Sequence, residues 1–192
     1  PDTYTMSETT NLTNHFLIAM PALKDENFEH TVTYVCEHTE EGAMGIVVNR
    51  PIELTLEDVF EQMSIEAGDE AMKTQAVFSG GPVGVERGFV LHSVTKPWHS
   101  TMQITDQICV TTSRDILEAM AEGKGPEDTL VALGYAGWAG GQLESEIRDN
   151  SWLSGPADYD ILFHRPAAER WKAAAAAIGV DLRLLSSDAG HA

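Results

Sequence analysis

The stretch from Leu130 to Ile147 most constrains what this chain folds into. Its first residues, 130–133, form a compact apolar run typical of a strand buried on both faces. Glycines and Trp138 follow, and then Leu143 and Ile147 recur four residues apart, as on one face of a helix. The stretch therefore predicts a strand, a Gly-rich turn and a helix. Free backbone N–H groups at such a junction often hold ligands, but the same glycines also suit a tight connection.

The rest of the chain adds short strands and amphipathic helices, in the ranges given at the end of this paragraph. Two alternating segments joined by a short Gly-containing turn predict an antiparallel hairpin. Hairpins come first and helices separate the later strands, which predicts an α+β fold with a mixed sheet of about eight or nine strands and about four helices. Expected strands are 15–20, 30–38, 44–49, 77–78, 88–92, 102–112, 130–136 and 159–163, and expected helices begin near Thr55, Ser113, Gln142 and Pro166. Residues 66–74 are expected to be a loop and 83–87 a turn.

The length and composition predict one domain. The chain has 192 residues, of which 43% are hydrophobic and 22% charged, which is ordinary for a globular protein with a substantial core. We find no internal repeat and no linker. Residues 15–185 are expected to form a single α+β domain, between a flexible N-terminal segment (1–14) and a frayed tail (186–192).

The charge balance bears on possible partners. Thirty acidic and twelve basic residues leave a net charge of −18. Such a surface repels phosphate backbones, so no direct nucleic-acid binding is expected. No run is long enough to span a membrane, and Cys36 and Cys109 lie in apolar segments, as buried thiols in a reducing compartment do, although a single disulfide is not excluded. These features predict a cytoplasmic protein; its oligomeric state stays open.

Three stretches together resemble the YqgE/AlgH family of bacterial proteins. They are Cys36–His38 with Gly42–Pro51, Gly80–Val83 with Arg87–His92, and Gly134–Trp138 with Gly141–Ile147, Asn150 and Trp152. The likeness runs from about His15 to Leu185. One departure is Trp138-Ala139-Gly140-Gly141, where the family more often has Gly-Pro-Gly.

The resemblance implies a forked sheet curled into a pseudo-barrel, mixed but mostly antiparallel, with flanking helices. The function of the family is largely uncharacterised. Some members are labelled putative transcriptional regulators, and no established catalytic residues carry over to this chain.

Three kinds of chemistry compete with purely structural roles for the polar residues. A metal site from His30, Cys36 and His38 lacks a fourth ligand, and neither cysteine sits in a strained nucleophile turn. Phosphate cradling by Gly80-Gly81 or Gly140-Gly141 matches no known phosphate loop, and the carboxylate of Glu144 would satisfy the helix start itself. We therefore assign no catalytic residue, no metal and no cofactor. Trp138 suits either a plug at the end of the core or a partner surface.

The sequence favours a non-enzymatic regulatory or protein-interaction module that acts indirectly. The alternative is an enzyme or small-anion-binding protein that uses Arg50, Arg87 and the Gly-rich loops, since positive charges are scarce on this acidic chain. The partner would be another protein or a small anionic ligand. We expect Arg50, Gly80-Gly81, Arg87 and Trp138 to surround one concave surface, and Arg50 to be exposed and of little importance for stability. The candidate binding residues are Asn49, Arg50, Gly80, Gly81, Arg87, Trp138, Gln142 and Glu144.

Overall fold

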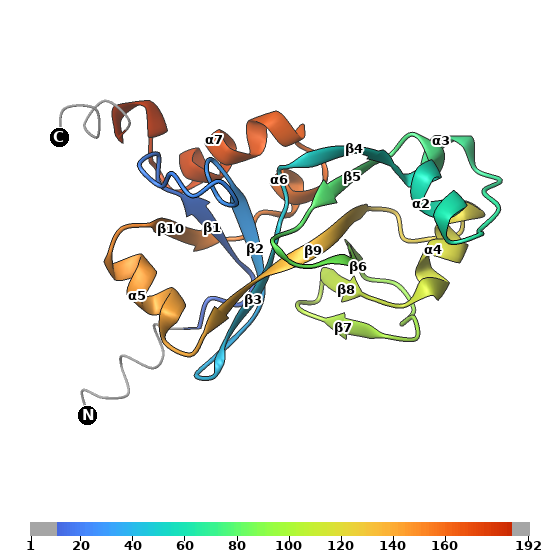
Figure 1. Cartoon of the computed structure of the whole chain (residues 1–192), viewed down its shortest axis with the longest axis horizontal. Helices are drawn as coiled ribbons and strands as arrows, with labels where there is room; N and C mark the ends of the chain where they lie inside the picture. The colour runs from blue at the N-terminus through green and yellow to red at the C-terminus, as the bar shows by residue number, and fades with distance from the viewer. Residues whose placement is uncertain (1–10, 186–192) are drawn as a thin grey trace.

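The long strand β9 (Thr129–Ala139) runs through the middle of the computed structural model, which describes residues 11–185 (Figure 1). It begins in the apolar run that the sequence singled out. One side of β9 pairs with β6 (Val83–Ser93). The other side pairs first with β5 (Ala76–Ser79), in parallel, and then with β3 (Gly42–Val47), antiparallel. The sheet therefore forks along β9, which confirms the expected α+β fold with a curled, mostly antiparallel sheet.

Ten strands join this sheet, in the order β10-β1-β2-β3-β9-β6-β8-β7, with β5 and β4 forming the branch. β2 and β3 form the expected hairpin, whose register shifts between Val35 and Glu37. The remaining strands are β1 (His15–Ala19), β2 (Val32–Thr39), β4 (Pro51–Thr55), β7 (Thr101–Gln103), β8 (Ile108–Thr111) and β10 (Trp152–Pro156).

Helices cover the sheet in two groups (Figure 1). The helices α2 and α4 pack at one end against β5, β6 and β9, while α6 and α7 contribute to the core that includes β1 and β2. A capping box stabilises the start of α2, where Oδ2 of Asp58 accepts the backbone N–H of Thr55 at 2.9 Å. The bounds are α2 (Leu56–Gln62), α3 (Glu70–Lys73), α4 (Arg114–Ala121), α5 (Gln142–Arg148), α6 (Tyr159–Phe163) and α7 (Ala167–Ala177).

Some expected elements were wrong. Residues 159–163 form the helix α6 and not a strand, because Asp158 caps the segment by accepting the Ile161 N–H at 3.0 Å. Residues 83–87 extend the strand β6, and residues 70–73, expected to be loop, form α3. The strands β4 and β10 were not expected. β4 pairs with β5 and β10 pairs with β1, and in both pairs the partner is distant in the sequence, so local sequence patterns do not predict β4 and β10.

The two ends of the chain fall largely beyond the described part of the structure. Residues 1–10 and 186–192, which the sequence assigned to the flexible segment and the tail, lie outside the described residues. Within the segment expected to be flexible, Leu12 is buried in the core cluster that also contains Trp138. Between residues 11 and 185, no helix has the length and apolar character needed to cross a membrane.

Candidate functional site

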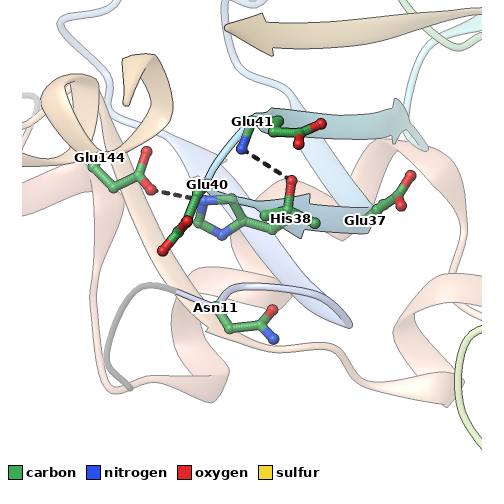
Figure 2. Close-up of a pocket in the computed structure, with 7 residues that line it drawn as sticks. Asn11, Glu37, His38, Glu40, Glu41 and Glu144 are labelled. Carbon is green, nitrogen blue, oxygen red and sulfur yellow. Dashed lines mark hydrogen bonds and ion pairs between the residues drawn. The ribbon is translucent and has the colours of Figure 1, made fainter. Parts of the chain in front are cut away.

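A cavity of about 550 Å³ lies beside the turn between β2 and β3. It collects acidic side chains from two elements that are distant in the sequence, and Figure 2 shows Glu144 reaching from α5 towards the ring of His38. This concentration of negative charge favours cationic groups over anions. The lining residues are Asn11, Glu37, His38, Thr39, Glu40, Glu41 and Glu144.

His38 is the buried centre of this cavity wall, with 2% of its side chain exposed. The backbone N–H of Leu12 donates to Nδ1 at 2.9 Å. Nε2 must therefore carry the ring proton, which it donates to Oε2 of Glu144 at 3.0 Å. Both ring nitrogens of this neutral imidazole are occupied by protein groups. His38 thus ties the chain before β1 and the helix α5 to β2.

The start of α5 is held by a second set of contacts. Gly141, the residue before the helix, has φ +80°, which favours glycine. Oε1 of Gln142 accepts the backbone N–H of Ala139, and Nε2 of Gln142 donates to Oε2 of Glu146, both at 2.9 Å. Gln142, one of the candidate binding residues, therefore orders the turn from β9 into α5.

Trp138 lies in β9 and not in the glycine turn itself. Its indole Nε1 donates to Oε1 of Glu146 at 2.9 Å, and the indole of Trp152 donates to the same oxygen at 2.9 Å. The ring of Phe28 stacks on Trp138 with centroids 6.2 Å apart. With 6% of its surface exposed, Trp138 closes the end of the core, the plug role among the two that the sequence left open.

A second cavity, here called the concave groove, has a volume of about 570 Å³ and lies along the strands β3, β9, β6, β8 and β7. Phe89, Val110 and Tyr135 line it from the central strands. Met44 on β3 and Met102 on the edge strand β7 line it from strands at its two sides. Met102 is 40% exposed, which is high for a large apolar side chain. The other lining residues are Glu37, Arg87, His99, Ser100, Thr101 and Thr112.

Arg87 contributes a guanidinium group to the wall of the concave groove. Its guanidinium carbon lies 5.5 Å from the centre of the Phe89 ring, and Phe89 in turn meets Tyr135 edge-on at 5.7 Å. Among residues 11–185, Arg87 makes no ion pair with a carboxylate. An exposed guanidinium in this arrangement is oriented by the aromatic ring, and its N–H donors are available to an anionic group.

Asn49 and Arg50 hold a loop in place. The side-chain amide of Asn49 accepts the Val32 N–H and donates to the His30 carbonyl, both at 2.9 Å. The expectation that Arg50 is exposed was wrong, because the residue is only partly exposed and its donors are used by the protein. The guanidinium donates, at 2.7 to 2.8 Å, to the backbone carbonyls of Glu26, Asn27 and Glu29.

Gly80 and Gly81 permit a close approach between two strands. The N–H of Gly80 donates to the carbonyl of Leu133 at 2.7 Å. A Cβ at Gly80 would collide with the carbonyl oxygen of Gly134, and one at Gly81, where φ is +150°, would collide with the carbonyl of Tyr135. The absence of side chains at both positions is therefore explained by packing against β9.

The structure does not gather Arg50, Gly80-Gly81, Arg87 and Trp138 around one concave surface, as was expected. Glu144 lines the acidic cavity, Trp138 a smaller cavity of about 290 Å³, and Arg87 the concave groove. Glu37 lines all three, so these cavities are neighbours around the β2–β3 hairpin. Arg50 and the glycine pair are engaged in the backbone contacts described above. The expected surface shared by Arg50 and Trp138 is thus not present, and the residue common to the three cavities is Glu37.

The groups considered for metal binding and nucleophilic chemistry lie apart. Cys36 and Cys109 are free and buried, and desolvation raises the pKa of both thiols, which keeps them protonated and weakly nucleophilic. The ring of His30 stacks on Trp171 with centroids 4.2 Å apart, away from His38. Within the part of the chain that the structure describes, no group of three or more His, Cys, Asp or Glu side chains is placed to hold a metal ion.

Sequence reasoning missed most of the concave groove. Met44, Phe89 and Tyr135 lie in segments that were recognised as strands, but their common face follows from the pairing order β3-β9-β6. The register shift between Val35 and Glu37 also moves Glu37 off the simple alternation of β2. The one local signal was Met102, an apolar residue in a short polar segment.

Comparisons with known proteins give a consistent result. An AlgH-like family model matches residues 16–183. A UPF0301 protein of Thioalkalivibrio sulfidiphilus is 61% identical over 97% of this chain and 100% of its own length. A UPF0301 protein of Methylococcus capsulatus is 54% identical over 96% and 98% of the two chains.

Solved structures agree. The solution structure of the AlgH protein from Pseudomonas aeruginosa matches with a TM-score of 0.79 at 50% identity, covering 95% of this chain and 97% of that one. A crystal structure from Corynebacterium diphtheriae, with a TM-score of 0.72 at 19% identity and 91% coverage of both chains, shares the fold. With a matching family model over most of its length and relatives more than half identical to it, the chain belongs to the AlgH-like family of uncharacterised UPF0301 proteins.

Proposed function

We propose that this chain is a non-enzymatic interaction module that binds a segment of another protein in the concave groove. The observation that carries the proposal is Arg87, which lies over Phe89 in a groove of mixed apolar and polar lining and makes no ion pair among residues 11–185. The segment would offer an apolar side chain to the methionines of the groove and a carboxylate to Arg87. Any regulatory effect on transcription would then pass through the bound protein.

The composition of the groove supports a protein segment as the ligand. Met44 and Met102 are flexible and polarizable, and methionines of this kind adapt to varied apolar side chains. Aromatic and arginine side chains, here Phe89, Tyr135 and Arg87, are those that most often dominate the affinity of protein interfaces. The net charge of −18 repels a strongly acidic partner at long range, so the acidic residue of the segment would be recognised only through its local contact with Arg87.

The alternative of a small-anion site at Arg50, Arg87 and the Gly-rich loops has less support. Arg50 donates to three backbone carbonyls, and Gly80 and Gly81 pack against β9. Within residues 11–185, Arg87 is the member of that group whose guanidinium is not bonded to the protein backbone, and it shares the groove with Met44, Met102 and two aromatic rings as well as with Glu37. These apolar side chains suit an amphipathic ligand better than an inorganic anion, which would also face the carboxylate of Glu37.

Selection from a random peptide library displayed on phage tests the proposal. The selected peptides are expected to combine an apolar residue with Asp or Glu. Their affinity should fall at least about tenfold, or about 1.4 kcal/mol, for Arg87→Glu and for Met102→Asp. Arg148→Glu is the matched control, since Arg148 is an exposed arginine on α5 that receives the same charge change away from the groove.

The melting temperature of each variant identifies folding defects separately from binding. Peptides without acidic residues would overturn the proposal. Equal losses for Arg87→Glu and Arg148→Glu would also overturn it, because the effect would then reflect net charge and not the groove.

A further inference from the structure

Another cavity, here called the helix pocket, lies between the helices α2 and α4 and the sheet that they cover. It has a volume of about 310 Å³. Val59 lines it from α2 and Leu117 from α4, while Val90 on β6 and Val131 on β9, which pair in register, line it from the sheet. All four belong to the core cluster at the end of the molecule where Figure 1 shows these two helices. The helix pocket therefore opens onto part of the hydrophobic core.

The helix pocket is separate from the concave groove. Thr111 on β8 is level with Val90 on β6, and both line the helix pocket, whereas Val110, one residue earlier, lines the groove. Because successive side chains of a strand point to opposite faces, the two cavities lie on opposite faces of the sheet. Phe89 and Thr112 contribute to both cavities. A ligand of the helix pocket is therefore independent of the protein segment proposed for the groove.

Gly88 leaves space open in the helix pocket. It lies on β6 two residues before Val90, on the same face, and lines the pocket. Its φ is not positive, and a Cβ added to it would meet only Cδ2 of Leu133, at 4.0 Å. Neither the backbone conformation nor close packing therefore requires a glycine here. Glycine weakens the interior of a strand, and it often marks a bulge or a place that a ligand approaches closely; the register shift of β6 precedes Gly88, which is itself level with Leu133.

The charged side chains at the helix pocket are Glu86 and Arg114. The guanidinium of Arg114 donates to the carboxylate of Glu118 at 2.9 Å, so its charge is compensated within α4. Glu86 is exposed and makes no ion pair among residues 11–185. An uncompensated carboxylate beside an apolar surface complements a cationic group, and the net charge of −18 also attracts cations.

We propose that the helix pocket binds a small amphipathic amine, whose apolar body packs against the core side chains and whose ammonium group meets Glu86. An ammonium group has three donors, and Gln62 and Thr112, which also line the pocket, carry oxygen acceptors. An apolar lining with a few polar groups is the composition typical of small-molecule sites. An apolar carboxylate would be a poorer ligand, because it would face Glu86 while Nε of Arg114 is already bonded to Glu118.

Three probes that share one apolar body and differ in the head group test this proposal: phenethylamine, phenethyl alcohol and phenylpropanoate. Each is titrated into the full-length protein, and the amide and methyl chemical shifts are followed by two-dimensional NMR. Saturable shift changes are expected at Val90, Leu117 and Val131. Phenethylamine should bind at least about tenfold more tightly than phenylpropanoate, with the alcohol between them.

Gly88→Val tests the place of binding. The added side chain occupies the open space, so the saturable shifts should be lost with all three probes. The melting temperature should not fall, because valine suits a strand and the new Cβ meets no clash. Gly137→Val is the matched control: Gly137 lies on β9 outside the helix pocket, its φ is not positive, and its Cβ would meet only the ring of Tyr135, at 3.6 Å. This variant should bind the probes as the unmodified protein does.

Glu86→Gln tests the head group. It should reduce the preference for phenethylamine over phenylpropanoate at least about threefold, because an exposed carboxylate contributes modestly to an ion pair. Glu53→Gln is the matched control, since Glu53 is an exposed glutamate of β4 outside the helix pocket that makes no ion pair among residues 11–185. Its variant loses the same charge and should keep the preference.

Two sets of results would overturn the proposal. The site is wrong if no probe causes saturable shifts at the helix pocket, or if Gly88→Val binds the probes as well as the unmodified protein does. The ligand class is wrong if phenylpropanoate binds as tightly as phenethylamine, or if Glu86→Gln and Glu53→Gln lose the preference equally. In that last case the preference would reflect the net charge of the protein and not the contact with Glu86.

Discussion

His38 on β2 and Glu144 on α5 are joined by a hydrogen bond of 3.0 Å between Nε2 and Oε2, although they are 106 residues apart in the sequence. Since the Leu12 N–H occupies Nδ1, the histidine is the neutral tautomer with its proton on Nε2. This pair fastens α5 and the start of the domain to the β2–β3 hairpin, which also borders the concave groove.

Replacing His38 should therefore destabilise the domain. His38→Phe keeps an aromatic ring but leaves the Leu12 N–H without its acceptor, and the free energy of unfolding is expected to fall by about 1–3 kcal/mol. Glu144→Gln retains an oxygen acceptor and should cost less. Urea unfolding measures both, and the ¹⁵N shifts of the His38 ring report the tautomer. An unchanged unfolding midpoint for His38→Phe would contradict this role.

Gly141 should not tolerate a β-branched residue. Its φ is +80°, and a Cβ added to it would meet no other atom within 4 Å. The cost of Gly141→Val is therefore backbone strain and not a clash, and we expect a loss of about 1–3 kcal/mol. Gly68→Val is the control, because Gly68 has equally open space and no positive φ. Thermal or urea unfolding measures the stability of both variants. If Gly141→Val and Gly68→Val lose the same free energy of unfolding, backbone strain at Gly141 is not the explanation.

Arg50→Ala should lower the stability, contrary to what its sequence position suggests. The substitution leaves the carbonyls of Glu26, Asn27 and Glu29 without their shared donor, for an expected loss of about 1–3 kcal/mol. Arg50→Lys should recover only part, since a lysine ammonium lacks the planar fork of donors. Arg148→Ala, at an exposed arginine of α5, should be nearly neutral in the same unfolding experiment.

His92 should make the protein sensitive to mild acid. Its ring is fully buried; Nδ1 donates to the Ser93 carbonyl, and Nε2 forms a hydrogen bond with the Thr111 hydroxyl, from which it accepts when the ring is neutral. Desolvation lowers the pKa of His92 in the folded state below its ordinary value near 6.5. Its contribution to stability is complete above about pH 6.5 and is lost as the pH falls through the folded pKa. Urea unfolding between about pH 7.5 and 5 measures this.

The pKa of His164 is shifted in the opposite direction from that of His92, so His164 supplies the control. Hydrogen bonds to Asp128 and Asp160 raise the pKa of this exposed ring, so its contribution is complete below the unfolded value and lost as the pH rises through the folded pKa. Repeating the series in His164→Gln removes that contribution. If the free energy of unfolding of His164→Gln does not decrease as the pH is lowered from about 6.5, the role of His92 is contradicted.

The purified protein should not bind duplex DNA specifically. Its net charge of −18 opposes phosphate contact, and the exposed arginine of the concave groove is a single charge beside Glu37. Fluorescence anisotropy with labelled duplex, at low and at physiological salt, measures this directly. Tight binding that weakens steeply with added salt would show that the electrostatic reasoning is wrong.

Local patterns determined much of the fold. The strand β9, the helix α2 and the β2–β3 hairpin could be predicted from the sequence, because each depends on residues that are close together in the chain. The local signals are the apolar run before Gly134 for β9, the pair Thr55 and Asp58 for α2, and the turn at Gly42 for the hairpin. The positive φ at Gly141, in the Gly-rich turn predicted from the sequence, has the same local origin. These features depend on backbone sterics and side-chain capping within a few residues.

Only the tertiary structure decided which of these residues meet. The order of the strands in the sheet brings together segments that are distant in the sequence. Three features depend on it: the pairing of β10 with β1, the contact of Arg50 with three backbone carbonyls, and the groove between Met44 and Met102. A shift of one residue in any strand would move its side chains to the opposite face. The sequence by itself therefore determined most of the strands and helices and the scarcity of positive charge, while long-range pairing decided that Arg50 is structural and that Arg87 faces the groove.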